Sequence, residues 1–419
     1  MHPNALLELA TDLLHQVLQF QAPADRVVSD FFRTHRALGS RERHSLAETT
    51  YGVLRNRLLF QHLAQSGKGE MERRLVLLAW QGNEGFLRAA LSEQEQQWLE
   101  QVKAVDRGAL PAKLRHNLPE WLAEPLEAAL GAEFWPLVDS LNQAAPLDLR
   151  VNTFKAKRED VQAALKAGGI DADVTPYSPW GLRIHGKPAL NKVEAFNRGE
   201  IEVQDEGSQL LALLADAKRG EMVVDFCAGA GGKTLALGAS MRNTGRLYAF
   251  DTSGHRLAAL KPRLARSGLS NVYPIQIAHE RDERIKRLAG KIDRVLVDAP
   301  CSGLGTLRRN PDMKWRQSPQ AIEELKTKQA AILASAARLL KPGGRLVYAT
   351  CSVLDGENEG IATAFTEAQG RDFVPLPALQ ALEKAHVGDA ASLVRGDYLR
   401  LWPHKHGTDG FFAAVWERR

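Results

Sequence analysis

Three cysteines are the residues of this 419-residue chain with the clearest potential for chemistry. Cys301 follows the apolar run Ile292–Val297, Cys351 follows the run Leu346–Ala349, and Cys227 lies in a glycine-rich loop after a third apolar run. The carboxyl ends of parallel strands share one edge of an α/β sheet, and such folds bind ligands there. We therefore expect all three thiols at one ligand-facing edge, although a buried cysteine more commonly acts as a small hydrophobe.

Composition limits the classes of protein that remain. A chain of this length predicts two or three domains, and 44% hydrophobic with 25% charged residues is ordinary for a globular protein. It has no apolar stretch of the roughly 18 residues that cross a membrane. Its start lacks a secretion signal, and its few scattered cysteines predict a reducing cytoplasm and no metal site. The net charge of +5 weakly favours an anionic partner such as nucleic acid.

The hydrophobic periodicity changes twice along the chain. Residues 1–143 have helical spacing over Leu6–Leu18, Ser45–Leu63 and Trp121–Leu130, which predicts a helical domain. Residues 144–205 predict a small α/β module with strands at Leu147–Val151, Ala172–Thr175 and Leu182–His185 and a helix over 158–167.

Residues 206–419 alternate between apolar strands and helices, which predicts a mainly parallel, doubly wound sheet. A long helix is expected over Ile322–Leu340, and antiparallel strands near Tyr398–Leu401 and Phe411–Trp416 close the sheet. The expected parallel strands are Met222–Phe226, Leu247–Phe250, Val272–Ile275, Ile292–Val297 and Gly344–Ala349.

The glycine-rich loop Cys227–Lys233 opens a helix, as phosphate-binding and nucleoside-binding loops do. A P-loop needs glycine where Cys227 stands, so the loop does not fit an NTPase. A nucleoside cofactor needs an acid about 20 residues further on for its ribose hydroxyls, and Asp251 has that place. From these residues alone, NAD and S-adenosylmethionine (SAM) are equally compatible, and Asp251 as a plain helix N-cap before Ser253 is the alternative.

The segment Leu307–Arg316 is basic, and either nucleic-acid contact or a solvated loop would explain it. Cations hold phosphates and an aromatic ring stacks on a base. The predicted RNA-binding residues are Arg308, Arg309, Lys314, Trp315 and Arg316.

One reaction needs both a SAM-type pocket and a cysteine, namely methylation of a pyrimidine at C5. A thiolate that adds to C6 makes C5 nucleophilic, and covalent catalysis of this kind divides a hard step into easier ones. Asp298 is placed to hold a proton at N3 during the attack. A second thiol or a water is the candidate base for the later loss of the C5 proton.

These residues resemble the RNA cytosine-C5 methyltransferase family, the Sun/Fmu or RsmB/NOP group, and most closely its bacterial small-subunit ribosomal members. The motifs that carry the resemblance are Leu149–Asn152, Cys227–Lys233, Asp298–Gly303, Arg309–Asp312, Thr350–Ser352 and Asp409–Phe412. The resemblance implies that Cys351 is the nucleophile and that Cys301 assists release of the methylated RNA. It also implies a Rossmann-like SAM domain, an RNA-recognition-like α/β module and an N-terminal domain like that of the antitermination factor NusB.

The predicted function is therefore SAM-dependent methylation of cytosine C5 in RNA, with 16S ribosomal RNA as substrate and a monomeric enzyme. A non-catalytic RNA-binding assembly factor is the alternative, and a NAD dehydrogenase would leave both strand-end thiols without a role. The predicted catalytic residues are Cys351, Cys301 and Asp298. The predicted cofactor contacts are Cys227, Ala228, Gly229, Ala230, Gly231, Gly232, Lys233, Asp251 and Asp298.

Two departures from the family pattern stand out. Gly229-Ala230 replaces the usual Ala-Pro pair of the loop. Ile277–His279 lacks the acid that family members carry near the adenine, so either Glu280 or Asp282 replaces it or the adenine contact is lost. These departures also allow a paralogue with another RNA target.

Overall fold

The computed structural model describes residues 2–186 and 188–419, and these form two compact units. One unit contains the residues up to Ala144 together with Thr306–Pro319. The other contains Ala145–Gly305 and Gln320–Arg419. The segment 306–319, which we expected in the catalytic domain, is thus part of the helical unit.

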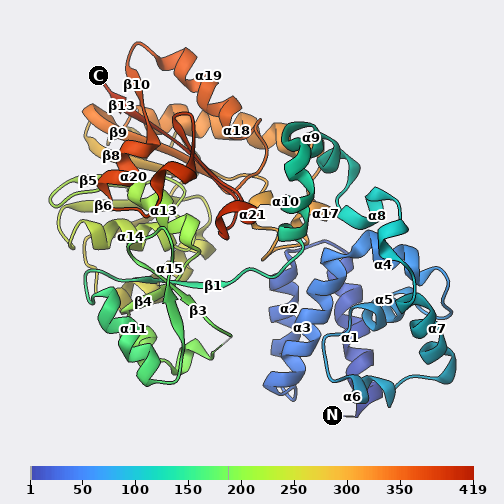
Figure 1. The fold of residues 1–419 in the computed structure, drawn as a ribbon. Coiled ribbons are helices and arrows are strands. Elements are labelled where there is room, and N and C mark those ends of the chain that lie inside the picture. Colours follow the sequence, from blue (N-terminus) through green and yellow to red (C-terminus); the bar gives the residue numbers. More distant parts are fainter. Residues whose placement is uncertain (1, 187) are drawn as a thin grey trace. The chain divides into compact units, whose positions relative to one another are not determined.

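The helical unit has an apolar core built by amphipathic helices. Figure 1 shows the helices α1 to α10 in blue to teal. α1 (Pro3–Leu18) buries one leucine-rich stripe and packs against α2, α3 and α5. The helix predicted over Ser45–Leu63 is two helices, because Asn56 leaves helical geometry with φ −113° and ψ 26°. The other helices are α2 (Ala24–Thr34), α3 (Ser40–Arg55), α4 (Arg57–Ala64), α5 (Met71–Ala79), α6 (Glu84–Arg88), α7 (Glu93–Lys103), α8 (Ala112–His116), α9 (Glu120–Leu130), α10 (Phe134–Leu141) and α17 (Met313–Arg316).

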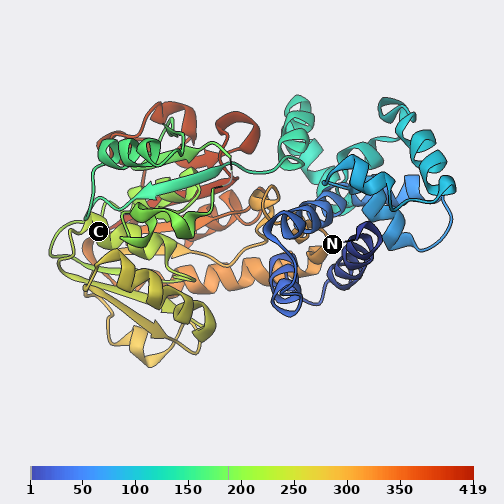
Figure 2. The same ribbon diagram turned by 90° about the horizontal axis from the view of Figure 1, so that it is seen from below.

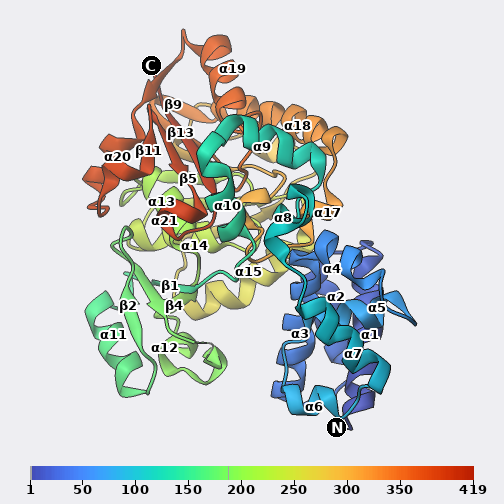
Figure 3. The same cartoon turned by 45° about the vertical axis from the view of Figure 1, so that its right-hand side comes forward.

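The small module begins the second unit with an antiparallel sheet of order β2-β3-β1-β4. Its strands are β1 (Leu147–Val151), β2 (Ala172–Val174), β3 (Gly181–Ile184) and β4 (Ile201–Val203), of which β4 was not predicted. α11 (Arg158–Ala167) and α12 (Glu194–Asn197) pack on one face of this sheet (Figure 3).

The opposite face of the module's sheet is polar, yet it is buried. Alternation along β1 places Asp148 and Arg150 on this face, where they are 1% and 2% exposed. Asp148 accepts hydrogen bonds from Arg183 (2.7 Å) and from the backbone N–H of Glu206 (3.1 Å) on α13 (Glu206–Leu214). This face therefore packs inside the unit and is not an open surface for RNA bases.

The large sheet has the order β11-β12-β13-β9-β8-β5-β6-β7, with β10 paired to β13. β5 to β9 are parallel, and β13 pairs with β9 antiparallel. This confirms the predicted doubly wound domain with antiparallel closing strands. The strands are β5 (Met222–Asp225), β6 (Arg246–Asp251), β7 (Val272–Gln276), β8 (Ile292–Asp298), β9 (Leu340–Thr350), β10 (Phe373–Leu376), β11 (Val394–Arg395), β12 (Tyr398–Leu401) and β13 (Phe411–Arg418).

Helices cover both faces of this sheet, because alternate strand residues point to opposite sides. Val223 belongs to an apolar cluster with residues of α13, α14, α15 and α20, whereas Val224 belongs to a cluster with residues of α16, α18 and α19. Figure 2 shows the long orange α18 beside the strands. The helices not yet given bounds are α14 (Gly232–Ser240), α15 (Gly254–Ser267), α16 (Glu283–Lys286), α18 (Pro319–Ala337), α19 (Glu359–Gln369), α20 (Ala378–Lys384) and α21 (Pro403–His406).

The helix predicted to reach Leu340 ends earlier, at Ala337. β9 begins at Leu340, four residues before the predicted start of this strand at Gly344. Among the described residues, no helix combines the length and apolarity needed to span a bilayer.

Candidate active site

The two cysteines that follow β8 and β9 lie against each other. These strands are parallel neighbours, with Asp298 opposite Ala349, so their carboxyl ends present the two loops side by side. The Sγ atoms of Cys301 and Cys351 are 3.4 Å apart, within hydrogen-bond distance for sulfur. Both side chains are partly exposed. The strand-end positions thus bring together two thiols that are 50 residues apart in the sequence.

The surroundings of Cys301 favour its protonated form. Its pKa is raised well above the ordinary value by the hydrogen bond with Cys351, by burial, and by the negative charges of Cys351 and Glu357. Thiolates, not thiols, are the nucleophiles in cysteine chemistry. Of the pair, Cys301 is therefore suited to keep its proton, and either sulfur can donate the hydrogen bond between them.

Cys227 has a different environment. Burial and the charges of Asp298, Asp225 and Asp251 raise its pKa well above the ordinary value. A thiol held in this form is a poor nucleophile. Cys227 instead serves as part of the glycine-rich loop. The backbone of this loop is tied to β6, because the next residue, Ala228, donates its N–H to Phe250 O at 2.8 Å.

The glycine-rich loop between β5 and α14 is shaped by close packing. Gly231 has φ +83°, and a Cβ there would lie 2.1 Å from Leu260 Cδ1 on α15. Gly229 also has positive φ, at +57°, but a Cβ there would have only Arg256 Nη1 near it, at 3.8 Å. Glycine is required at Gly231 for packing, whereas Gly229 leaves an open backbone that a ligand can approach.

Asp251 ties the end of β6 to this loop. Its Oδ2 accepts the Gly229 N–H at 2.8 Å, and its Oδ1 accepts the Ser253 N–H at 2.7 Å. Ser253, not Asp251, caps α15 by accepting from Arg256 N. The Asp251 carboxylate therefore remains on the loop, with a lone pair of Oδ2 available to a hydroxyl.

Asp225, beneath the loop, has a carboxylate oxygen that accepts no hydrogen bond. The side chain is fully buried, and its Oδ1 has no hydrogen-bond partner, while its Oδ2 accepts from Thr234 at 2.6 Å. Burial raises the pKa of Asp225 to about 7, although the Thr234 hydrogen bond opposes this shift. A buried polar atom without a partner is costly, and such atoms cluster at functional sites.

Lys233 contacts a predicted catalytic residue in addition to being part of the glycine-rich loop. Its Nζ donates to Asp298 Oδ2 at 2.7 Å. Burial lowers the pKa of Lys233, but Asp298 and Cys351 raise it more, so it lies above the ordinary value. The lysine therefore stays charged beside both predicted catalytic groups. The Gly-Gly-Lys spacing was a signal of this role, since it places the lysine in the first turn of α14.

The C-terminal motif Asp409–Phe412 supports the loop that carries Cys301. Gly410 donates its N–H to Gly305 O at 2.8 Å, and Gly305 donates its N–H to Cys351 O at 2.9 Å. A Cβ at Gly305 would lie 2.1 Å from Gly410 O and 2.8 Å from Cys351 O. Three chain segments therefore meet here at a distance that only glycine permits.

The predicted RNA-binding residues have mixed positions within the helical unit. Lys314 is 2% exposed and donates to Arg55 O at 2.9 Å, and Trp315 donates its Nε1–H to Leu54 O at 2.8 Å. Arg308 is 6% exposed. These three residues hold the segment on the helices and do not present a surface for phosphates or stacked bases. Arg309 is half-buried and Arg316 is exposed, so they remain candidates for RNA contact.

The two acids expected to replace the missing acid near the adenine have different surroundings. Asp282 caps α16 and accepts the Ala278 N–H at 2.9 Å, so it lies against the position that lacks the usual acid. These backbone hydrogen bonds lower the pKa of Asp282. Glu280 pairs with its neighbour Arg281 at 3.6 Å. Asp282 is therefore the better placed of the two.

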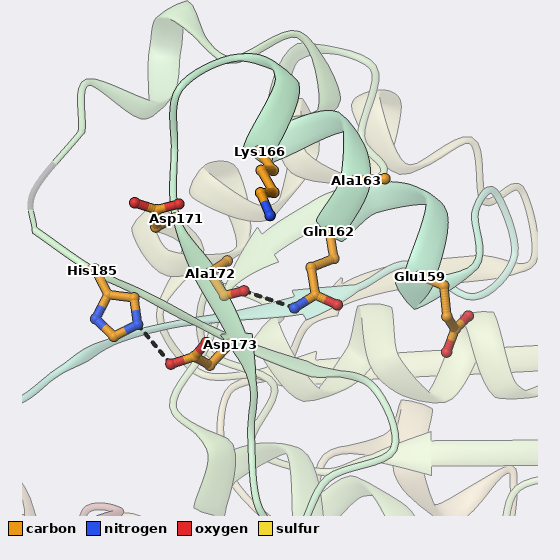
Figure 4. A pocket seen from close by; sticks show the side chains of 8 residues that line it. All are labelled: Glu159, Gln162, Ala163, Lys166, Asp171, Ala172, Asp173 and His185. Carbon is orange, nitrogen blue, oxygen red and sulfur yellow. Dashed lines mark hydrogen bonds and ion pairs between the residues drawn. The ribbon is translucent and has the colours of Figure 1, made fainter.

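A pocket of about 610 Å³ on the small module contains none of the predicted site residues (Figure 4). Its lining is polar, and His185 is bonded to Asp173 at 2.7 Å. In the part of the chain that the structure describes, no group of three or more His, Cys, Asp or Glu side chains could hold a metal ion.

The fold and the site together define a SAM-dependent methyltransferase. A glycine loop, an acid after the next strand and a Rossmann-like sheet serve nucleoside cofactors in general. The adjoining thiols at the neighbouring strand ends distinguish this site from that of a dehydrogenase, which would have no use for them.

Comparison with known proteins identifies the family. Residues 212–417 match the 16S rRNA methyltransferase RsmB/F family, and residues 118–191 match a ferredoxin-like domain of RsmF/B-like methyltransferases. The chain is 31% identical over 330 residues to ribosomal RNA small subunit methyltransferase B of Yersinia pseudotuberculosis, covering 79% of this chain and 72% of that one. It therefore belongs to the RsmB/F family of 16S rRNA methyltransferases.

Two further matches show how much of the chain resembles known proteins. The chain is 35% identical over 301 residues to ribosomal RNA small subunit methyltransferase B of Sodalis glossinidius. The match covers 72% of this chain and 66% of that relative, which is just under two thirds of its length. The crystal structure of PH0851 superimposes with a TM-score of 0.81 at 26% identity, covering 100% of this chain and 99% of that one. The likeness in fold thus includes the helical unit.

Proposed function

We propose that this protein methylates C5 of a cytosine in 16S ribosomal RNA through a covalent bond between Cys351 and C6 of the base. The observation that carries the proposal is the pair of thiols 3.4 Å apart at the ends of β8 and β9, with the Lys233–Asp298 ion pair beside them. Two thiols with unequal environments suit a reaction that needs a nucleophile first and a base afterwards.

The residues around the glycine loop fit SAM as the cofactor. Asp251 offers a carboxylate lone pair to ribose hydroxyls, and Gly229 leaves the loop open. The unpartnered Asp225 Oδ1 is an acceptor that a donor on the cofactor, or a water bound with it, would satisfy. SAM supplies an electrophilic methyl group when it is bound.

Cys351 attacks as a thiolate, and the charged Lys233 lies within electrostatic range of it. The S–C6 bond forms, the C5=C6 bond is lost, and C5 gains nucleophilic character. N3 takes up a proton from water as the ring gains negative charge, and the Asp298 carboxylate, oriented by its ion pair with Lys233, holds that proton by accepting the N3–H hydrogen bond. Removing the target base from its stack gives the thiolate access to C6.

Cys301 completes the reaction once C5 carries its methyl group. The hydrogen bond and the negative charge of Cys351 are two of the causes that raise the Cys301 pKa. Both disappear when the Cys351 sulfur is bonded to carbon, so Cys301 becomes easier to ionise only after the attack. Cys301 gives its own proton to water, and its thiolate then takes the C5 proton. C5=C6 re-forms, N3 loses its added proton to water, and the S–C6 bond breaks to return the Cys351 thiolate.

A direct assay tests this function. The purified full chain is incubated with 16S rRNA and SAM labelled in its methyl group, and modified nucleosides are identified by mass spectrometry. We expect label in 5-methylcytidine at one position. Binding of RNA with no methylation of any ribosomal RNA would instead support a non-catalytic assembly factor.

A further inference from the structure

A buried carboxylate next to the cysteine pair has no part in the reaction described above. Glu357 lies between β9 and α19 and is 0% exposed. A buried carboxylate is costly unless hydrogen bonds compensate for the lost water. Four donors reach Glu357, so its surroundings are built to hold it.

The donors to Glu357 come from both cysteine loops. Ser302, directly after Cys301, gives its backbone N–H to Oε1 at 2.9 Å and its hydroxyl to Oε2 at 2.5 Å. Ser352, directly after Cys351, gives its hydroxyl to the same Oε2. One carboxylate therefore joins the residues that follow each thiol.

A third element completes the arrangement. Gln329 on α18 donates its Nε2 to Glu357 Oε1 at 2.9 Å and to Pro300 O at 3.0 Å, immediately before Cys301. The backbone of Glu357 is itself held, because Tyr348 donates its hydroxyl to Glu357 O at 2.6 Å. Loops fixed on both sides by rigid elements keep reacting groups in their productive geometry.

The four donors suit a carboxylate, which only accepts hydrogen bonds. Two backbone or side-chain N–H groups reach Oε1, and the hydroxyls of Ser302 and Ser352 reach Oε2. A glutamine here can keep its amide oxygen toward the two N–H donors, but it loses the negative charge, and its NH₂ group makes both hydroxyls turn from donating to accepting. A side chain of the same volume is therefore not sufficient to replace Glu357.

The charge of Glu357 also makes the two thiols unequal. It is among the causes that raise the pKa of Cys301, and Lys233 is a charged group within range of Cys351. The Glu357 carboxylate thus favours the proton on Cys301, and the Lys233 ammonium is within range of the thiol that we propose attacks.

We propose that Glu357 is a positioning residue that fixes the loops of Cys301 and Cys351 and assigns the two thiols their separate roles. The proposal rests on the proposed function, because it concerns the same thiol pair. It predicts that the isosteric change Glu357→Gln disturbs both the geometry and the ranking of the thiols. A residue that only filled space would tolerate this change.

The test compares Glu357→Gln with Glu359→Gln in the full chain. Glu359 is a half-buried carboxylate two residues away whose partner is Arg400, so it is a matched control. Wild type and both variants are treated with limiting iodoacetamide near pH 8, and alkylation of Cys301 and Cys351 is counted by peptide mass spectrometry. We expect the Cys301-to-Cys351 labelling ratio to rise about tenfold in Glu357→Gln alone. The rate of covalent adduct formation with RNA should fall by about two orders of magnitude.

The outcomes separate the inference from the proposed function. If wild type methylates RNA and Glu357→Gln keeps its labelling ratio and adduct rate, Glu357 has no positioning role and the inference is overturned while the function stands. If wild type forms no adduct and no 5-methylcytidine, the function fails, and the labelling ratio still tests the effect of Glu357 on the thiols. If circular dichroism shows that Glu357→Gln is unfolded, Ser302→Ala replaces it. That variant should slow adduct formation, and an unchanged rate would count against the inference.

Discussion

The segment at the end of β8 divides into two halves that belong to different compact units, although both halves are rich in residue types that could do chemistry. Asp298–Gly305 remains at the sheet edge, where Asp298 pairs with Lys233 and Cys301 contacts Cys351. Thr306–Pro319 belongs to the helical unit, where Lys314 and Trp315 donate hydrogen bonds to backbone carbonyls of α3. The change occurs between Gly305 and Thr306.

The difference shows which kind of sequence signal is reliable. The topology of a parallel sheet fixes where a strand ends, so polar residues directly after a strand must lie at the ligand edge. A cation or an aromatic ring in a longer loop has no such constraint. Long side chains with N–H donors serve equally well to anchor a loop on a helix terminus, as Lys314 and Trp315 do.

Gly305→Ala disturbs the boundary between these halves and should have the largest effect on activity. A Cβ there meets the carbonyl oxygens of Gly410 and Cys351, which are backbone atoms that cannot turn aside. We expect methylation to fall by about 100-fold, because the Cys351 loop must shift. Gly356→Ala is the matched control, since its Cβ would meet only the flexible end of Lys326 at 3.6 Å or more. Equal activity of the two variants would show that Gly305 does not hold the site.

Trp315→Ala should act on stability instead of RNA affinity. The ring is half-buried in the helical core and has a hydrogen bond to Leu54 O, so we expect a loss of about 2 kcal/mol in the stability of this unit. Hydrogen exchange in α3 and α4, followed by mass spectrometry, measures the loss. Arg316→Ala, an exposed neighbour, should leave exchange unchanged. Weaker RNA binding by Trp315→Ala with unchanged exchange would support base stacking and remove the contrast between the two halves.

Lys314→Met should alter how stability depends on pH. Burial lowers the pKa of Lys314 to about 7, whereas a lysine in the unfolded chain has a pKa of about 10.4. Between these values the unfolded state binds more protons, so the contribution of Lys314 makes stability rise with pH by up to about 1.4 kcal/mol per unit. Urea unfolding from pH 7 to 9.5 should show a smaller rise in Lys314→Met than in wild type. The exposed Lys68→Met is the control, and identical slopes in all three proteins would contradict the buried position of Lys314.

The sequence was sufficient for the elements and residues that are governed by local pattern. The apolar strands β5 to β9 and the acid at the end of β6 follow from periodicity and spacing, and the structure has them where they were expected, apart from the earlier start of β9. The family resemblance, not geometry, ranked Cys351 above Cys301 as the nucleophile. That ranking remains a prediction, which the environment of Cys301 supports.

The remaining features depend on contacts between distant parts of the chain. The burial of Lys314 arises from α3, some 260 residues earlier, and no pattern near Lys314 reveals it. No local pattern marks Glu357, because its four donors come from residues on three separate elements. Lys233 was assigned to cofactor contact, since its partner Asp298 is 65 residues away.

The central claim is that the two thiols have successive roles, and a single experiment with two variants tests it. Cys301→Ser and Cys351→Ser are incubated with 16S rRNA and SAM and then separated by denaturing electrophoresis. We predict that Cys301→Ser accumulates a covalent protein–RNA adduct, because it attacks but cannot release, and that Cys351→Ser forms none. An adduct in Cys351→Ser and its absence in Cys301→Ser would reverse the assignment and contradict the account.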